Sequence, residues 1–143
     1  MIENRKSSRG FTLVELLLVL VILAVLASII VPKFTGRTEQ AKIAAATTDI
    51  SNLGVSLDAF EVDTGRYPTT DEGLRALTEL PGNIKKESWH GPYLKKAVAN
   101  DPWGHPYIYH CPGQHNQSSY DLSSMGPSGQ ENGGDAIDNW TSK

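Results

Sequence analysis

Cysteine is nearly absent from this chain, which has 143 residues and a single cysteine, Cys111. One cysteine cannot form an intramolecular disulfide, which argues against the small secreted scaffolds that depend on bridges. Positive charge is also scarce, with 13 lysines and arginines against 16 acidic residues. No basic patch or aromatic RNA-binding motif is present, so the sequence gives no support for nucleic-acid binding.

The short motifs that mark common catalytic and zinc sites are missing as well. The chain contains no H-E-x-x-H, C-x-x-C or G-x-S-x-G segment. Its histidines are His90, His105, His110 and His115. Steps of five residues place side chains on different faces of a helix and on opposite faces of a strand, so we expect solvated or locally bonded histidines. The prediction is that the chain is not an enzyme. A membrane-anchored periplasmic enzyme is the alternative from a different functional class.

One long apolar run near the N-terminus stands out against these absences. Residues 11–31 are apolar except for Thr12, Glu15 and Ser28. As a helix this run would be about 31 Å long, which matches the hydrocarbon core of a bilayer. Residues 1–10 are short and basic, and the positive-inside rule then places the N-terminus in the cytoplasm. The pattern predicts a leader over 1–10 and a transmembrane helix over 11–31, with the rest of the chain outside the inner membrane.

Glu15 distinguishes three interpretations of this segment: a cleaved secretory signal, a plain membrane anchor, and a helix that packs with copies of itself. A charge near the centre of a membrane helix costs about 2.5–3.5 kcal/mol, and neither a signal nor an anchor has a use for it. If the chain is cut between Gly10 and Phe11, the new α-amine lies one helical turn from Glu15. A neighbouring subunit shifted along the axis could then place its amine against this carboxylate. The simpler alternative is that Glu15 reaches the lipid headgroups.

Residues 10–15, Gly-Phe-Thr-Leu-Val-Glu, resemble the class III signal of type IV pilins and of the pseudopilins of type II secretion. In this superfamily a membrane peptidase cuts after the glycine and N-methylates the new N-terminal phenylalanine. The resemblance implies cleavage after Gly10 and methylation of Phe11. It also implies that Glu15 acts in docking the subunit onto a growing fibre, whose core the apolar helices form.

The helix is expected to continue well beyond the apolar run. Apolar residues recur at alternating steps of three and four, which places one apolar stripe along a helix. The stripe consists of Ile43, Ala46, Ile50, Leu53, Leu57 and Phe60. We predict one helix of about 50 residues, with residues 32–64 as an amphipathic continuation that packs on the protein's own sheet. Pro32 removes a backbone donor and Gly36 weakens the same turn, so a bent or locally melted hinge is expected between them.

Residues 65–143 have the composition of a soluble globular domain. Gly65 is expected to end the long helix, and a short helix is expected over residues 70–80. Residues 106–110 and 119–124 carry the alternation typical of short strands. The predicted fold class is α+β: a pilin-like long helix whose second half packs on a small antiparallel sheet, followed by a C-terminal loop.

Three further segments resemble the major pseudopilins of type II secretion: residues 65–74, 101–107 and 138–140, where Asp138 replaces a glycine. The resemblance implies a structural subunit of the periplasmic pseudopilus, a helical fibre that drives export of folded proteins across the outer membrane. Its implied partners are copies of itself, minor pseudopilins, the prepilin peptidase, the inner-membrane assembly platform and, before assembly, the lipid bilayer. A surface type IV pilin is the nearer alternative, although Cys111 alone cannot provide the C-terminal cysteine pair of many such pilins.

The C-terminal segment, residues 121–140, is rich in glycine, serine and asparagine and contains no lysine or arginine. Such a segment needs a staple, and carboxylate and carbonyl oxygens suit calcium. The resemblance implies a structural calcium ion here. By position, Met125 would offer its carbonyl and Asp135 its carboxylate, with Gln130 and Gly133 as further carbonyl donors.

This chain departs from the family at two of the positions that commonly hold aspartate in the loop. Ser128 and Ala136 stand there instead. Ser128 offers a neutral oxygen, and Glu131 or Asp138 are candidates to replace the lost carboxylates. Fewer carboxylates imply a weaker calcium site.

Overall fold

The computed structural model describes residues 10–131 and 133–141, apart from the side chains of residues 29–35. The predicted leader therefore lies outside the described residues except for Gly10. The chain separates into two units, Met1–Glu39 and Gln40–Lys143, and each is described by itself.

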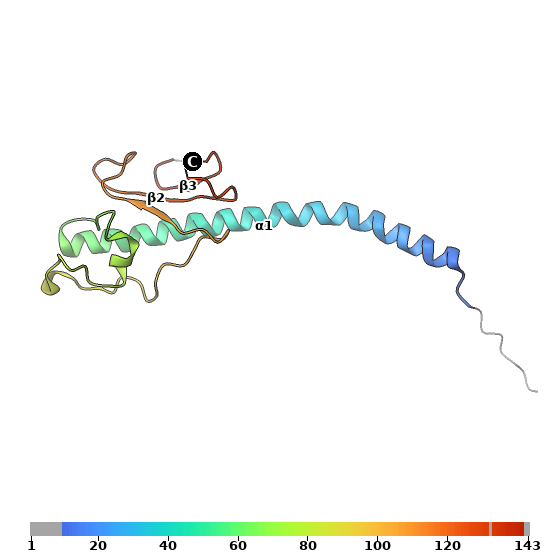
Figure 1. The fold of residues 1–143 in the computed structure, drawn as a ribbon, viewed down its shortest axis with the longest axis horizontal. Coiled ribbons are helices and arrows are strands. Elements are labelled where there is room, and N and C mark those ends of the chain that lie inside the picture. Colours follow the sequence, from blue (N-terminus) through green and yellow to red (C-terminus); the bar gives the residue numbers. More distant parts are fainter. Residues whose placement is uncertain (1–9, 132, 142–143) are drawn as a thin grey trace, which may run out of the picture. The chain divides into compact units, whose positions relative to one another are not determined.

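One helix, α1 (Leu13–Thr64), accounts for 52 residues and confirms the single long helix expected from the sequence (Figure 1). It is helical through Pro32 and Gly36, so the local melting expected there does not occur. A proline removes one backbone hydrogen bond, and the helical turns on both sides of it preserve the rest. The bend at this hinge stays a prediction. Gly65 ends the helix in the left-handed region, with φ of 78°, as expected of a glycine at this place.

In the first unit, α1 has apolar side chains on every face. Large apolar residues from Phe11 to Leu26 are exposed to between 46% and 76%. Over the described residues, no helix combines the length and the hydropathy that a membrane span requires.

The second unit contains a sheet of three short antiparallel strands in the order β1-β2-β3. The strands are β1 (Ile108–His110), β2 (Asp121–Ser124) and β3 (Ile137–Asp138). Tyr109 pairs with Leu122, and Ser123 pairs with Asp138. The two strands expected from the sequence are confirmed in shortened form. The third was missed because its two residues are too few to show alternation.

The short helix expected over residues 70–80 is wrong in length and in type. The structure has instead a 3₁₀ helix, η1 (Gly73–Leu77), and a second one, η2 (Lys86–Ser88). Gly73, the first residue of η1, has φ of 57°, which the interior of a right-handed helix does not accommodate, so no helix runs through it from residue 70.

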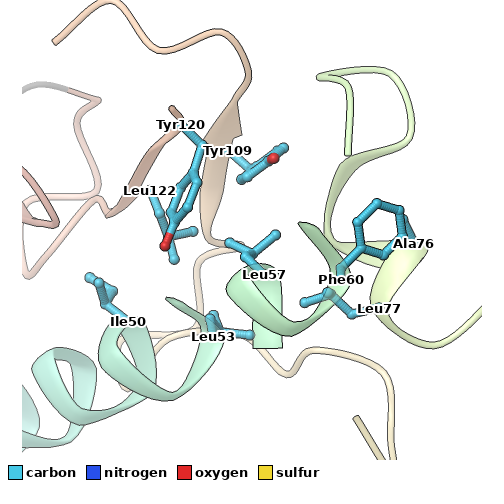
Figure 2. Packing of buried hydrophobic residues seen from close by; sticks show 9 residues of the cluster. All are labelled: Ile50, Leu53, Leu57, Phe60, Ala76, Leu77, Tyr109, Tyr120 and Leu122. Carbon is cyan, nitrogen blue, oxygen red and sulfur yellow. The ribbon is translucent and has the colours of Figure 1, made fainter. Parts of the chain in front are cut away.

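The core lies between α1, η1 and the first two strands (Figure 2). Its buried members are Ile50, Leu53, Leu57, Phe60, Ala76, Leu77, Tyr109, Tyr120 and Leu122. Full burial of one large apolar side chain contributes roughly 1.5–3 kcal/mol, so this cluster dominates the stability of the unit. The predicted helical stripe is confirmed from Ala46 to Phe60, whereas Ile43 is 37% exposed.

Three tyrosines of the loops and β1 region donate hydrogen bonds to three aspartates of α1. The pairs are Tyr107 with Asp49 (2.9 Å), Tyr67 with Asp58 (3.1 Å) and Tyr93 with Asp63 (2.7 Å). Burial and the adjacent aspartate raise the pKa of Tyr93 to about 12, so its hydroxyl stays a donor at neutral pH. These bonds fasten the loops along the polar flanks of the buried stripe.

The turn that follows α1 is closed by a two-pronged ion pair. Arg66 donates from Nη1 and Nη2 to the two carboxylate oxygens of Glu72, at 2.7 and 2.8 Å. The backbone N–H of Thr69 donates to the same carboxylate at 2.8 Å. The hydrogen bonds from Arg66 lower the pKa of Glu72 to about 2.

We predict that Glu72→Gln lowers the unfolding free energy near neutral pH by about 2 kcal/mol, because it removes a charge-assisted pair. The folded pKa of Glu72 lies below its unfolded value, so this contribution is present above about pH 4.5 and disappears as the pH falls toward 2. Denaturant unfolding of the fragment from Gly36 onward, which contains the whole core, measures both effects.

Glu79→Gln is the matched control. Glu79 is 71% exposed and lies 3.9 Å from Arg75, so its loss is expected to change stability by less than about 0.5 kcal/mol. Equal losses in the two variants would contradict a special role for the Arg66–Glu72 pair.

Candidate functional site

The expected processing site lies at the start of α1. Gly10 and Phe11 precede the helix, and both are exposed. Phe11 is 76% exposed, and open space surrounds the α-carbon of Gly10. The Gly10–Phe11 peptide bond is therefore in non-helical, accessible backbone, which is the state that a peptidase requires.

Glu15 lies in the first turn of α1, where a carboxylate interacts favourably with the helix dipole. The hydroxyl of Thr12 accepts a hydrogen bond from the backbone N–H of Glu15 at 3.2 Å. Thr12 therefore caps the helix through the backbone of residue 15, and this bond does not involve the Glu15 side chain. The interaction of the carboxylate with the helix dipole is a local contribution that sequence analysis did not consider.

The C-terminal loop begins from a buried hydrogen-bond relay. The carboxylate of Asp101 accepts hydrogen bonds from the backbone N–H groups of Trp103 (3.1 Å) and His105 (2.8 Å). It also accepts one from the hydroxyl of Ser124 at 2.5 Å. The Ser124 oxygen in turn accepts from the backbone N–H of Gly126 at 3.0 Å. The relay links the turn at residues 101–105 to the end of β2 and fixes where the loop starts.

Within the loop, Ser128 holds the carboxylate of Asp135 at both oxygens. Its backbone N–H donates at 3.0 Å and its hydroxyl at 2.7 Å. The hydrogen bond from the Ser128 hydroxyl is the main reason why the pKa of Asp135 is lowered. Two turns follow, in which Gly133 donates to the carbonyl of Gln130 and Ala136 donates to the carbonyl of Gly133.

Three oxygens of the predicted calcium loop converge beside Gly133. A β-carbon added there would lie 3.0 Å from Asp135 Oδ1 and 3.1 Å from both the Gln130 carbonyl and Ser128 Oγ. Glycine leaves this cradle open, and its all-oxygen lining fits calcium with one carboxylate. The structure therefore brings together three of the five predicted ligand residues around the α-carbon of a fourth, Gly133. Met125 lies directly after β2, and its carbonyl as a ligand stays a prediction.

Neither carboxylate considered as a replacement turns toward the cradle. Glu131 Oε1 lies 3.5 Å from His110 Nε2 on β1. Asp138 accepts hydrogen bonds from the backbone of Trp140 and from both the N–H and the hydroxyl of Thr141. In the described residues, no three His, Cys, Asp or Glu side chains are grouped as in a metal centre. Apart from the carboxylate of Asp135, a calcium ion here would depend on neutral oxygens.

Sequence analysis missed the role of Asp121. Its carboxylate accepts hydrogen bonds from three successive backbone N–H groups, those of Gln114, His115 and Asn116, at 2.6–2.9 Å. Burial raises the pKa of Asp121, but these three donors outweigh it and the net shift is downward. A preceding loop rich in polar residues was the available signal, and it does not specify which carboxylate the loop wraps around.

Two family models cover nearly the whole chain. The prokaryotic N-terminal methylation motif matches residues 5–31. The model described as Type II secretion system (T2SS), protein G, matches residues 33–140. The chain belongs to the protein G family of type II secretion systems. The family expected from residues 65–74, 101–107 and 138–140 is thereby confirmed.

Curated protein G sequences are similar over their full length. Type II secretion system core protein G of Pseudomonas aeruginosa is 40% identical over 141 residues, covering 96% of this chain and 98% of that protein. The Escherichia coli K12 protein of the same name is 43% identical over 138 residues, covering 92% and 90%. That of Vibrio cholerae is 40% identical over 142 residues, covering 96% and 95%.

A solved structure of a major pseudopilin shares the fold. The crystal structure of the major pseudopilin from the type 2 secretion system of enterohaemorrhagic Escherichia coli superposes with a TM-score of 0.60 at 33% identity. The match covers 74% of this chain and 92% of that one. The predicted pilin-like α+β fold is confirmed, and the protein G family is one of structural subunits of the secretion pseudopilus rather than of enzymes.

We predict that Ser124→Ala destabilises the protein by about 1–3 kcal/mol, because it leaves the buried Gly126 N–H without an acceptor and removes a donor from Asp101. Urea unfolding followed by tryptophan fluorescence measures the loss. Ser123→Ala is the control, since Ser123 is similarly buried on β2 but lies outside the relay. If the two alanine variants are equally stable, the relay does not hold the loop.

Proposed function

We propose that this chain is the major subunit of a periplasmic pseudopilus, and that its N-terminal helix assembles the fibre. The observation that carries the proposal is the exposure of apolar side chains on every face of α1 from Leu13 to Leu26. A helix of this kind is stable only in lipid or against other apolar helices. The second unit has its own core and needs neither, so it can remain folded while the helix changes surroundings.

In this proposal the prepilin peptidase cuts after Gly10 and methylates the amine of Phe11. Residues 11–31 lie in the inner membrane of a Gram-negative cell before assembly, with the N-terminus in the cytoplasm. The assembly platform then moves the subunit into the fibre, where apolar helices pack together. Minor pseudopilins would cap or initiate this fibre, and repeated addition of subunits would push folded proteins through the outer-membrane channel.

Glu15 supplies the register of assembly. Its carboxylate lies one helical turn from the amine that cleavage creates, so an axial shift between neighbouring subunits brings one subunit's amine to the next subunit's Glu15. Charge pairing is strong among apolar helices because little water screens it. A subunit in the wrong register would leave both charges unpaired.

We predict that Glu15→Gln and Glu15→Ala both leave the protein inserted and cleaved but abolish fibre assembly and secretion. Glutamine keeps the size and polarity of the side chain and removes its charge, and both variants keep the backbone hydrogen bond to Thr12. The measurement is complementation of a strain that lacks this subunit, with immunoblots for cleavage, sheared fibres and exported protein. Thr12→Ala, which removes the cap and keeps the charge, is the control and should still secrete.

Normal secretion with Glu15→Gln would refute the charge-pairing role of Glu15. Accumulation of full-length chain in the same variant would instead place Glu15 in recognition by the peptidase.

We propose further that the cradle formed by Ser128, Gln130, Gly133 and Asp135 binds calcium. What supports this is the convergence of three oxygens beside Gly133. With a single carboxylate, the affinity should lie at the weak end of calcium sites, in the range of roughly 0.1–1 mM.

We predict that calcium raises the melting temperature of the fragment from Gly36 onward relative to chelator. Calcium at 100 times its Kd adds about 2.7 kcal/mol, which for a unit of this size corresponds to roughly ten degrees. Asp135→Asn should abolish the rise, and magnesium is the control ion. Identical melting in chelator and in 10 mM calcium, a concentration of about ten or more expected Kd values, would show that the loop has no calcium site.

A further inference from the structure

The C-terminal loop is already closed by protein groups alone. Ser128 donates to Asp135 from its backbone N–H and from its hydroxyl, and these two bonds join the two ends of the loop. Gly129 packs against the imidazole of His105, where a β-carbon would lie 2.9 Å from Nε2. Gly126 packs directly against the carbonyl of Asp135. The loop is therefore closed by the Ser128–Asp135 hydrogen bonds and also packs tightly against its neighbours at Gly126 and Gly129.

The chemistry of residue 128 decides what this closure requires. A serine hydroxyl is a donor and can bond to a carboxylate without any ion. An aspartate at the same position, the residue that the family commonly has, accepts only. Two carboxylates facing each other at such short range repel and need a cation between them.

We propose that Ser128 makes closure of this loop independent of metal. The hydroxyl of Ser128 donates its proton directly to the carboxylate of Asp135. An aspartate at position 128 could be joined to Asp135 only through a cation. Calcium, where it binds, would enter a cradle that is already formed instead of ordering an open loop. This inference does not rest on the calcium proposal, because it concerns the loop in the absence of the ion.

Amide hydrogen exchange by NMR, on the full chain in detergent micelles with chelator present, tests the proposal. The reporters are the amides of Ser128, Gly129, Gly133 and Ala136, which are hydrogen-bonded within the closed loop. We expect all four to be protected in the unaltered protein. Ser128→Ala should speed their exchange by about tenfold, the loss expected for one hydrogen bond to a charged acceptor.

Three further variants sharpen the result. Ser128→Thr keeps a hydroxyl and should keep the protection. Ser128→Asp should lose protection in chelator and regain it in calcium, since it restores the second carboxylate. Ser118→Ala is the control, because Ser118 is an exposed serine outside the loop. In each variant the core amides of Leu57 and Leu122 report whether the domain itself remains folded.

Two outcomes would overturn the proposal. One is a loop in the unaltered protein that exchanges like an open chain in chelator and becomes protected only in calcium. The other is unchanged protection in Ser128→Ala in chelator, which would show that the hydroxyl does not hold the loop. A calcium effect on melting without either outcome would leave the proposal standing.

Discussion

The structure depends on one division within α1, between turns that are apolar on every face and turns that are apolar along a single stripe. The stripe from Ala46 to Phe60 is buried by the rest of its own chain. The turns from Leu13 to Leu26 are not covered by any described part of the chain, and their side chains are exposed on every face of the helix. Folding of one subunit therefore buries the apolar stripe in the second half of the helix. The apolar side chains of the first half remain to be buried by lipid or by other subunits.

A sheet of three short strands suffices for the second unit because much of this unit is bonded to α1 and not to the sheet. Strands of two to four residues have few ladder bonds, and isolated short strands are marginal in water. The three tyrosine–aspartate bonds hold the intervening loops along the helix, and the Arg66–Glu72 pair closes the turn that follows it. Most of the chain after Gly65 can consequently lack helix and strand and still have a fixed conformation. The C-terminal segment is fixed by its own hydrogen bonds.

Sequence patterns predicted those features whose cause lies in nearby residues. The apolar run, the stripe and the helix end at Gly65 each follow from periodicity or from one residue's backbone preference, and each was found. Contacts that depend on the path of the folded chain were not found. The relay joins Asp101 to Ser124, 23 residues later in the sequence. The loop around Asp121 is held through backbone N–H groups, which no residue type marks in the sequence. The short helix failed for a local reason, since nothing in the sequence marks Gly73 as left-handed. In the loop, composition suggested a metal staple, whereas geometry showed which oxygens meet and that Glu131 turns away to His110.

Glu15 and Asp135 show opposite solutions to the same problem, a carboxylate that must be compensated. Asp135 finds both donors in Ser128, seven residues earlier in its own chain, so its environment is complete in one molecule. Glu15 has a helix dipole and a cap on its backbone, which stabilise a charge only modestly, and its surroundings are apolar side chains. Under the proposed function, the compensating cation comes from another copy of the chain, whose amine would be created by cleavage after Gly10. A carboxylate that is paired only between copies, together with a C-terminal loop closed by its own hydrogen bonds, suits a subunit that folds alone and is stabilised at its N-terminus in a fibre.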